Sequence, residues 1–226
     1  MTLRWRDLTG AVLAWSLAAL CVRLGFWQLE RLRERRARNA EIAAARALPP
    51  VELPVVHLDP DAVRDRRATA RGVYDYAHER VWAGRTFRGA PGVALLTPLR
   101  MADGSAVFVD RGWVPSADAR HIDATRFGEG DSAAIAGLVL PVPRDRGDVD
   151  PARLRDSVPY VVLPIVIQLD DTAAPHPAGL ARWRTPPLDG GPHLSYAIQW
   201  FCFGGIAVVG TVLLLKKRAQ EERHFP

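Results

Sequence analysis

His193 is the residue with the clearest chemical capacity in this sequence. It opens the segment His-Leu-Ser-Tyr-Ala-Ile-Gln-Trp-Phe, residues 193–201, at the start of a long apolar stretch. A neutral imidazole nitrogen there would face the boundary between water and membrane beside aromatic side chains. It is able to ligate a haem iron if the macrocycle finds an apolar slot between two helices. From the residues alone, a polar residue at the N-terminus of an interfacial helix is the simpler interpretation.

Other catalytic or metal-binding patterns are missing from the sequence. It contains no G-x-S-x-G elbow, no P-loop, no dinucleotide-binding glycine pattern and no H-E-x-x-H zinc helix. The acidic residues are spread through expected turns, so no carboxylate pair is set up for acid–base catalysis. We therefore expect a protein that is not an enzyme. The remaining histidines lie among polar neighbours or prolines and are interpreted as surface residues: His57, His78, His121, His176 and His224.

The two cysteines, Cys21 and Cys202, both lie inside apolar segments. This placement excludes a disulfide framework or a zinc ribbon in an aqueous domain. Cys21 is eight residues before Leu29 and Cys202 is eight residues after Leu194. In helices, both would lie about 12 Å below one membrane face. We interpret them as small packing residues, with a redox or metal pair as the alternative.

Two apolar segments of 22 residues each, Leu8–Leu29 and Leu194–Leu215, must position these side chains. A helix of about 20 apolar residues crosses a bilayer, so both are predicted to be transmembrane helices, the second beginning at residue 193. The first is predicted to be a retained anchor and not a cleaved signal peptide. Leu20 is too bulky for processing before Cys21, and no small-x-small site follows.

Small residues recur every four positions in both apolar segments. They are Gly10, Ala14 and Ala18 in the first, and Ala207 and Thr211 in the second. Membrane helices use such faces to pack closely, so we expect the two helices to be in contact. Chance recurrence in an Ala-rich chain is the alternative.

Two spans place both termini on one side of the membrane. Basic residues occur both in the tails, residues 1–7 and 216–226, and in the flanks of the central domain. Their distribution therefore does not decide the orientation in the membrane. Long domains translocate with little regard for charge, and the run Lys216-Lys217-Arg218 is typical of a cytoplasmic end. We therefore place the central domain outside the cytoplasm. Arg23 lies about 9 Å inside the boundary set by Leu29, close enough for its side chain to reach the surface.

Residues 30–48 are predicted to form a helical stalk. The sequence from Leu29 to Leu48 lacks Gly and Pro and is rich in Ala, Arg and Glu, which favour helix. Pro49-Pro50 ends this helix.

Residues 49–192 are predicted to form one β-rich domain outside the membrane. Ala102-Asp103-Gly104 is expected to form a turn, and Pro98 and Pro164 belong at sheet edges or bulges. One short helix is expected within Arg144–Arg155, capped by Asp150. The predicted strands are rich in Val, Ile, Leu and aromatic residues: Thr69–Tyr76, Gly92–Arg100, Ser105–Val114, Ala133–Val142 and Tyr160–Leu169.

Few helical stretches separate these strands, which favours a mainly antiparallel sheet or a small barrel. The predicted fold class is therefore an α+β membrane protein, in which two transmembrane helices flank a mainly antiparallel β domain.

The net charge of +5 and the pI near 9.7 come from the regions beside the membrane. Residues 30–46 contain six Arg and three Glu, whereas residues 47–192 contain 17 basic and 19 acidic residues. Nucleic-acid binding needs a basic patch on the folded domain itself, so this function class is excluded. Membrane lipid is the expected partner of the basic residues.

Several motifs occur in a fixed order along the chain. They are Leu24-Gly-Phe-Trp-Gln-Leu-Glu-Arg31, Gly72-Val-Tyr-Asp75, the stretch Gly89 to Pro115 with Leu-Leu-Thr-Pro-Leu and Arg-Gly-Trp-Val-Pro, and the segment that His193 opens. Together with the two spans they resemble the surfeit locus protein 1 family along almost the whole chain. The resemblance is weakest in residues 116–188.

This resemblance implies an assembly factor for haem–copper cytochrome c oxidase in a bacterial cell (inner) membrane, with the central domain outside. It implies haem a as a cofactor, and the oxidase catalytic subunit and the haem a synthesis machinery as partners. The family's candidate haem ligand maps onto His193, with Tyr196 as its neighbour and Trp200 further along that helix face. Position alone points to three arginines for the haem propionates: Arg23, Arg31 and Arg33.

Two other function classes share parts of this layout. A two-span membrane sensor with an external binding domain would need a separate signalling partner, because the tail from Lys216 has only 11 residues. A membrane-tethered hydrolase is the enzymatic alternative, and the missing catalytic motif counts against it.

The motif Arg111-Gly112-Trp113 has two interpretations. It is either a docking surface for an oxidase subunit or an internally paired arginine beside a core tryptophan. We favour the second.

Overall fold

The computed structural model describes residues 5–55, 58–142, 158–170 and 176–224. They form two compact units, one from Met1–Glu41 with Leu188–Pro226 and one from Ile42–Pro187. The predicted short helix within Arg144–Arg155, with its cap Asp150, lies outside the described residues.

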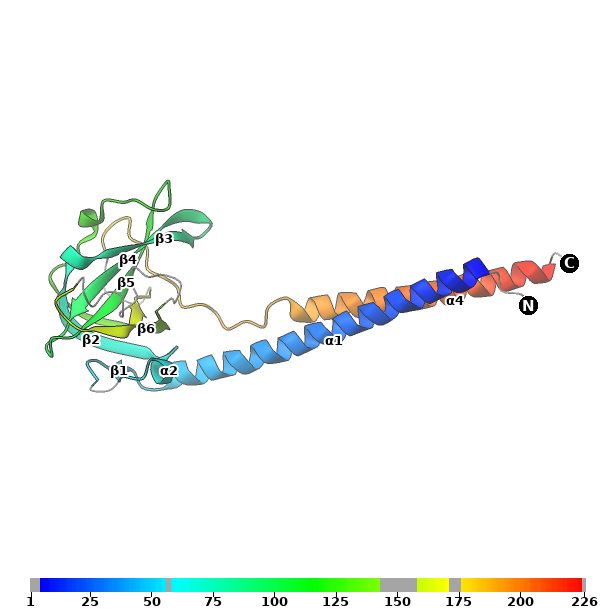
Figure 1. Cartoon of the computed structure of the whole chain (residues 1–226), viewed down its shortest axis with the longest axis horizontal. Helices are drawn as coiled ribbons and strands as arrows, with labels where there is room; N and C mark the ends of the chain where they lie inside the picture. The colour runs from blue at the N-terminus through cyan, green and yellow to red at the C-terminus, as the bar shows by residue number, and fades with distance from the viewer. Residues whose placement is uncertain (1–4, 56–57, 143–157, 171–175, 225–226) are drawn as a thin grey trace. The chain divides into compact units, whose positions relative to one another are not determined.

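The first unit is a pair of long helices. Helix α1 covers Trp5–Ala47 and α4 covers His193–His224, and they lie side by side with both chain ends at the same end of the pair (Figure 1). Helix α1 runs without interruption through the predicted span and stalk, and α4 continues past Leu215. Both contain a stretch long and apolar enough to cross a membrane. The two helices of the predicted fold class are therefore present.

Small side chains let the two helices approach closely. On α1, Ala18, Cys21 and Gly25 are buried and follow one another at spacings of three and four residues, as in a coiled-coil contact face. A Cβ atom added to Gly25 would lie 2.6 Å from the Phe201 ring, so this ring rests on the α1 backbone. The expected helix contact is thus confirmed, although Gly10 has no atom within 4 Å of its added Cβ and is not part of it.

A disulfide tests this contact. A Cβ atom at Gly204 would lie 3.5 Å from Cys21 Cβ, which is within the range of about 3.5–4.5 Å found in disulfides. We expect Gly204→Cys, in a Cys202→Ser background, to cross-link to Cys21 on mild oxidation, detected by mass spectrometry of the joined peptides. Gly205→Cys is the matched control, because position 205 has no neighbour within 4 Å. Equal cross-linking of both variants would contradict the packing.

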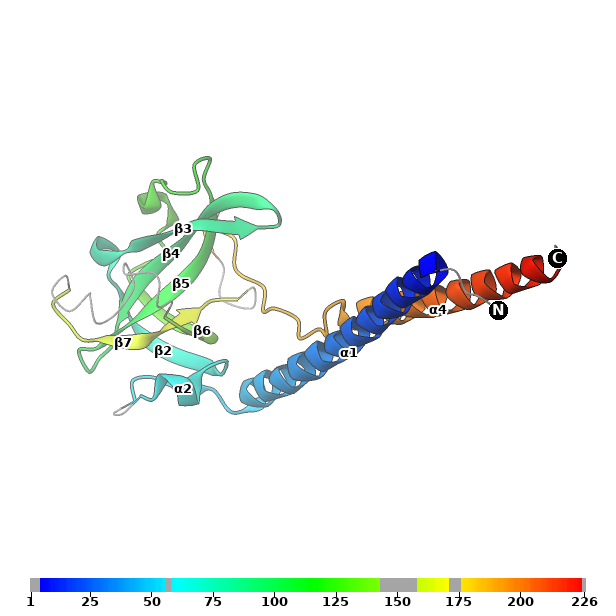
Figure 2. The ribbon, with the colours of Figure 1, turned by 45° about the vertical axis from the view of Figure 1, so that its right-hand side comes forward.

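The second unit is a closed β structure. Five strands pair in a ring in the order β2 (Arg67–Tyr74), β6 (Ser132–Pro141), β7 (Val162–Gln168), β5 (Ala106–Pro115) and β4 (Ala90–Arg100), which returns to β2. Two further strands extend the sheet: β1 (Val51–Glu52) beside β2 and β3 (Arg80–Phe87) beside β4. The described part of this unit also contains three short helices, which are α2 (Pro60–Val63; Figure 2), η1 (Tyr76–His78) and η2 (Ala124–Phe127).

The five predicted strands are all present, and most pairings are antiparallel, as expected. The sheet is nevertheless mixed, because β1–β2 and β5–β7 are parallel. The predicted turn at Ala102-Asp103-Gly104 joins β4 to β5, with Gly104 at a φ of 84°. Pro98 lies where β4 changes its partner from β3 to β2, and Pro164 lies in the irregular stretch of the β5–β7 pairing. Strands β1 and β3 were not predicted.

The core fills the interior of this closed sheet. Its largest cluster includes apolar side chains from β2, β4, β5, β6 and β7. These side chains are almost completely buried. Gly72 allows the ring to close, because a Cβ atom there would lie 2.1 Å from the backbone oxygen of Arg100 on β4.

Candidate functional site

His193 is held by a residue of the other long helix. Its Nδ1 atom lies 2.9 Å from Oε1 of Gln28, and the side chain is half-buried. An amide oxygen only accepts hydrogen bonds, so Nδ1 carries the proton and donates it. In the described part of the chain, Nε2 of this ring has no hydrogen-bond partner. The structure therefore presents an imidazole with one nitrogen fixed and the other available.

The backbone that leads into α4 is tied to α1 beside this ring. Asp189 accepts from Arg35 through its carbonyl oxygen (3.2 Å) and its carboxylate (3.4 Å), and its carbonyl also accepts from Nδ2 of Asn39 (2.7 Å). The same carboxylate accepts from the backbone N–H of Gly191. A Cβ atom added to Gly191 would lie 3.5 Å from the His193 ring and 3.6 Å from Nε of Arg35. These contacts fix the approach of the chain to His193.

The other predicted site residues are placed less directly. Trp200 is half-buried and lies seven residues after His193, on nearly the same face of α4. Tyr196 is 47% exposed at the flank of this face. Arg23 is exposed and lies two residues from both Cys21 and Gly25, so it is on the side of α1 that faces away from α4. The structure brings His193 and Trp200 onto one face and does not bring Arg23 to them.

The residues present fit a single histidine ligand. Nε2 of His193 is free to bind, and the described residues contain no cluster of His, Cys, Asp or Glu that would hold a bare metal ion. At the level of Phe201 the two helices leave no slot between them, because this ring rests on Gly25. The apolar surface next to His193 is instead the exposed flank of α4, which includes Tyr196 and Leu194.

Arg111 lies inside the β domain and not on its surface. It is 0% exposed and contacts Glu79, Glu129 at 3.0 Å and Thr97 at 2.7 Å. Burial opposes the charge of this guanidinium, but the two glutamates outweigh it, so its pKa is raised. Arg182 bridges from Glu129 to the carbonyl oxygen of Arg111.

Trp113 is 7% exposed and stacks against Phe87 at 5.5 Å between ring centroids. Both residues of the motif thus have internal roles, as we favoured.

Asp110, next to Arg111, forms a second buried polar group. Its carboxylate accepts from Nε1 of Trp183 (2.8 Å), Nε2 of Gln168 (3.3 Å) and the backbone N–H of Gly112 (3.1 Å). Burial raises the pKa of this carboxyl despite these bonds. These donors satisfy the carboxylate and tie β7 and the segment around Trp183 to β5, so its role is structural.

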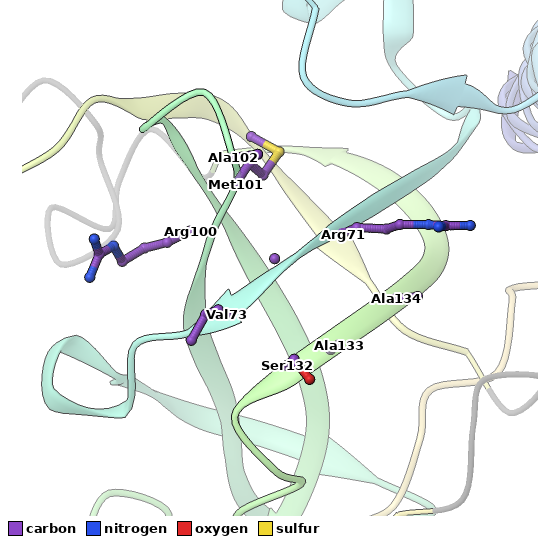
Figure 3. Close-up of a pocket in the computed structure, with 9 residues that line it drawn as sticks. Arg71, Val73, Arg100, Met101, Ala102, Ser132, Ala133 and Ala134 are labelled. Atoms are coloured by element: carbon purple, nitrogen blue, oxygen red, sulfur yellow. The ribbon is translucent and has the colours of Figure 1, made fainter.

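A surface hollow of about 680 Å³ lies between β2, the β4–β5 turn and β6. Figure 3 shows that the side chains of Arg71 and Arg100 extend toward opposite sides of it. Because its polar groups do not converge, the hollow does not resemble a catalytic or ligand site.

Comparison with known proteins decides the family. The model of the SURF1 family matches residues 16–205. The chain belongs to the SURF1 family. It is 29% identical to a SURF1-like protein of Mycobacterium tuberculosis, over 91% of this chain and 81% of that protein. It is 28% identical to a SURF1-like protein of Monosiga brevicollis, over 92% of this chain and 89% of that protein.

SURF1-family proteins are known as cytochrome oxidase assembly factors, and the family is not known as catalytic. The matched range includes both sides of the His193–Gln28 contact and the whole β domain. The resemblance stated from the motifs is therefore confirmed at the level of the family.

Two residues beside His193 were not singled out from the sequence of this SURF1-family chain. Gln28 and Arg35 continue the contact face of α1, with spacings of three and four residues from Gly25 through Leu32. The recurrence every four residues from Gly10 to Ala18 leads to positions 22, 26 and 30, so it does not predict this face. Alternating spacings of three and four from Ala18 lead to Gln28 and Arg35, but these positions are polar and so carry no pattern of small residues.

Proposed function

We propose that this SURF1-family chain is a membrane-bound assembly factor that holds haem a and hands it over to the catalytic subunit of cytochrome c oxidase. Its partners are that subunit and the haem a synthesis machinery. It resides in a bacterial cell membrane, with the β domain outside the cytoplasm and both tails inside.

The geometry of His193 carries this proposal. One ring nitrogen donates to Gln28 at 2.9 Å, and the other is available at the start of an apolar helix. Histidines that ligate metals typically use the second nitrogen for such a hydrogen bond. His193 would thus hold the haem iron through Nε2, while the apolar flank with Tyr196 and the neighbouring Trp200 would shield the haem from water.

A carrier must also release its cargo. One histidine ligand gives an affinity that can be reversed, whereas a closed cavity with two ligands would retain the haem. Haem a supplies redox chemistry once it is in the oxidase, and this chain contributes only binding, orientation and shelter.

Several arginines lie near the expected membrane surface and are available to haem propionates. Arg31 pairs with Glu34 at 2.8 Å and stacks on Trp27, while Arg33 is exposed. Arg35 lies beside the His193 ring, so it is a better placed candidate than Arg23.

Absorption spectroscopy tests the ligand. We expect the full chain, co-expressed with haem a synthesis and purified in detergent, to contain haem a, and His193→Ala to retain less than about one tenth of it, because the axial bond is lost. His121→Ala is the matched control, since that histidine is 86% exposed in the β domain. Full haem content with an unchanged spectrum in His193→Ala would refute the ligand assignment.

Oxidase maturation separates this function from a membrane sensor. A strain without the protein is expected to contain oxidase with a deficit of haem a, and His193→Ala should fail to restore it. Normal haem content in the oxidase of that strain would contradict the assembly function and favour the sensor.

A further inference from the structure

Gln28 stands out among the polar residues of the helix contact face. It is half-buried between Gly25 and Leu32, and its described hydrogen bond is the one to Nδ1 of His193. A half-buried amide loses part of its contact with water, and its hydrogen bond to His193 compensates for that loss. Ala or Leu at position 28 would be sufficient for helix packing. The hydrogen bond from His193 to Gln28 therefore indicates a role other than packing.

We propose that Gln28 is a positioning residue that fixes His193 in the tautomer with the proton on Nδ1 and so directs the lone pair of Nε2 toward the ligand. The role toward a ligand rests on the proposed function, whereas the choice of tautomer does not. Free neutral imidazole exchanges between two tautomers, and the hydrogen bond made by one nitrogen decides which of them is present.

The surroundings of the ring support this role. A Cβ atom at Gly191 would lie 3.5 Å from Cδ2 and 3.7 Å from Nε2 of His193, and one at Gly190 would lie 3.2 Å from Leu32. Gln28 thus holds the ring at Nδ1, and glycine at 191 leaves the opposite edge, with Cδ2 and Nε2, without a side chain against it. A larger residue at 190 would press on Leu32 of α1, and one at 191 would be strained because φ there is 64°.

Nuclear magnetic resonance of the haem-free protein tests the tautomer. In the full chain labelled with ¹⁵N-histidine, in detergent at about pH 8, the His193 signal, assigned by its loss in His193→Ala, is expected to show a protonated Nδ1. Gln28→Leu, which removes the acceptor, should shift the signal toward the Nε2–H form, and Gln28→Glu should retain the wild-type form. Gln199→Leu, a change at an exposed site on α4, is the control. A protonated Nε2 in the wild type would overturn the proposal.

Haem binding tests the consequence. Loss of such a supporting hydrogen bond typically weakens metal binding about 10-fold or more. We therefore expect the affinity of Gln28→Leu for haem a to be lower than that of Gln199→Leu by about this factor. Gln28→Glu should retain it with a lower midpoint potential, because a carboxylate acceptor makes the imidazole a stronger donor to iron. An unchanged affinity and potential in both Gln28 variants would also overturn the proposal. If the tautomer result holds but His193→Ala keeps full haem, only the proposed function fails.

Discussion

Arg111→Met is expected to lower the free energy of unfolding of the protein by about 3–5 kcal/mol, because removing one partner of a buried ion pair leaves uncompensated charge. Arg111 is fully buried and contacts two carboxylates, Glu79 and Glu129. Without it, Glu79 keeps Thr97 as a neutral donor, and Glu129 keeps Arg182. Met keeps the apolar stem of the side chain, so the change removes the charged guanidinium with its hydrogen bonds and leaves the volume of that group unfilled.

Urea unfolding in detergent, followed by near-ultraviolet circular dichroism, measures this effect on the β domain. Arg120→Met is the matched control, because Arg120 is exposed and such changes stay within about 0.5 kcal/mol. The double variant Arg111→Met/Glu79→Gln should be less destabilised than the sum of its single changes, since it removes the buried charge together with its partner. A loss below about 1 kcal/mol in Arg111→Met would mean that the ion cluster contributes little.

The two helices and most of the barrel follow from patterns that act locally. A run of 22 apolar residues such as Leu8–Leu29 determines a membrane helix by its composition. Strands such as Ser105–Val114 stand out because they contain short apolar runs rich in β-branched and aromatic residues, here Ala106–Val109 and Trp113–Val114. These features need no knowledge of distant residues, so the sequence predicts them.

Local sequence patterns do not predict strand β3 or the parallel pairing of β5 with β7. Residues Arg80–Phe87 mix two Arg with Gly and Thr and are only half-buried, so no apolar run or clean alternation marks them. The parallel pair β5–β7 joins residues 56 to 58 positions apart, and nothing in either strand specifies the direction of its partner. The contact between Gln28 and His193 spans an even greater separation of 165 residues. In the sequence, only the position of His193 at the start of an apolar segment pointed to this site, and nothing pointed to Gln28 as its partner.

The inward direction of Arg111 has a local cause that the sequence contained but did not reveal. Leu95 pairs with Gly112, whereas Leu96 pairs with Asp110, so Arg111 is the additional residue of a β-bulge. Every residue from Ala106 to Val114 is buried, so both faces of β5 are covered and Asp110 and Arg111 are both buried although they are consecutive. A run that two charged residues interrupt does not show by itself that both of its faces are covered. The charged pair was therefore compatible with a surface motif until the pairing was known.

Gly112→Ala is the change that should disrupt this bulge. Gly112 has a φ of 136°, which side chains rarely allow, and an added Cβ would lie 2.5 Å from the backbone oxygen of Ala181. Both problems involve backbone, so neither is relieved by rotating a side chain. The Trp113–Ala181 bridge, held by two hydrogen bonds of 2.8 and 2.7 Å, would have to separate. We expect a loss of about 3 kcal/mol or more in the free energy of unfolding.

Gly128→Ala is the matched control, because an added Cβ there meets nothing within 4 Å and its φ of −63° suits any residue. That variant should unfold within about 1 kcal/mol of the wild type. Since Arg182 follows Ala181 and donates to the carbonyl oxygen of Arg111, separating the bridge also removes a donor from the ion cluster. Gly112→Ala and Arg111→Met should therefore be less than additive when combined. Full additivity would show that the bulge and the ion cluster stabilise the barrel independently.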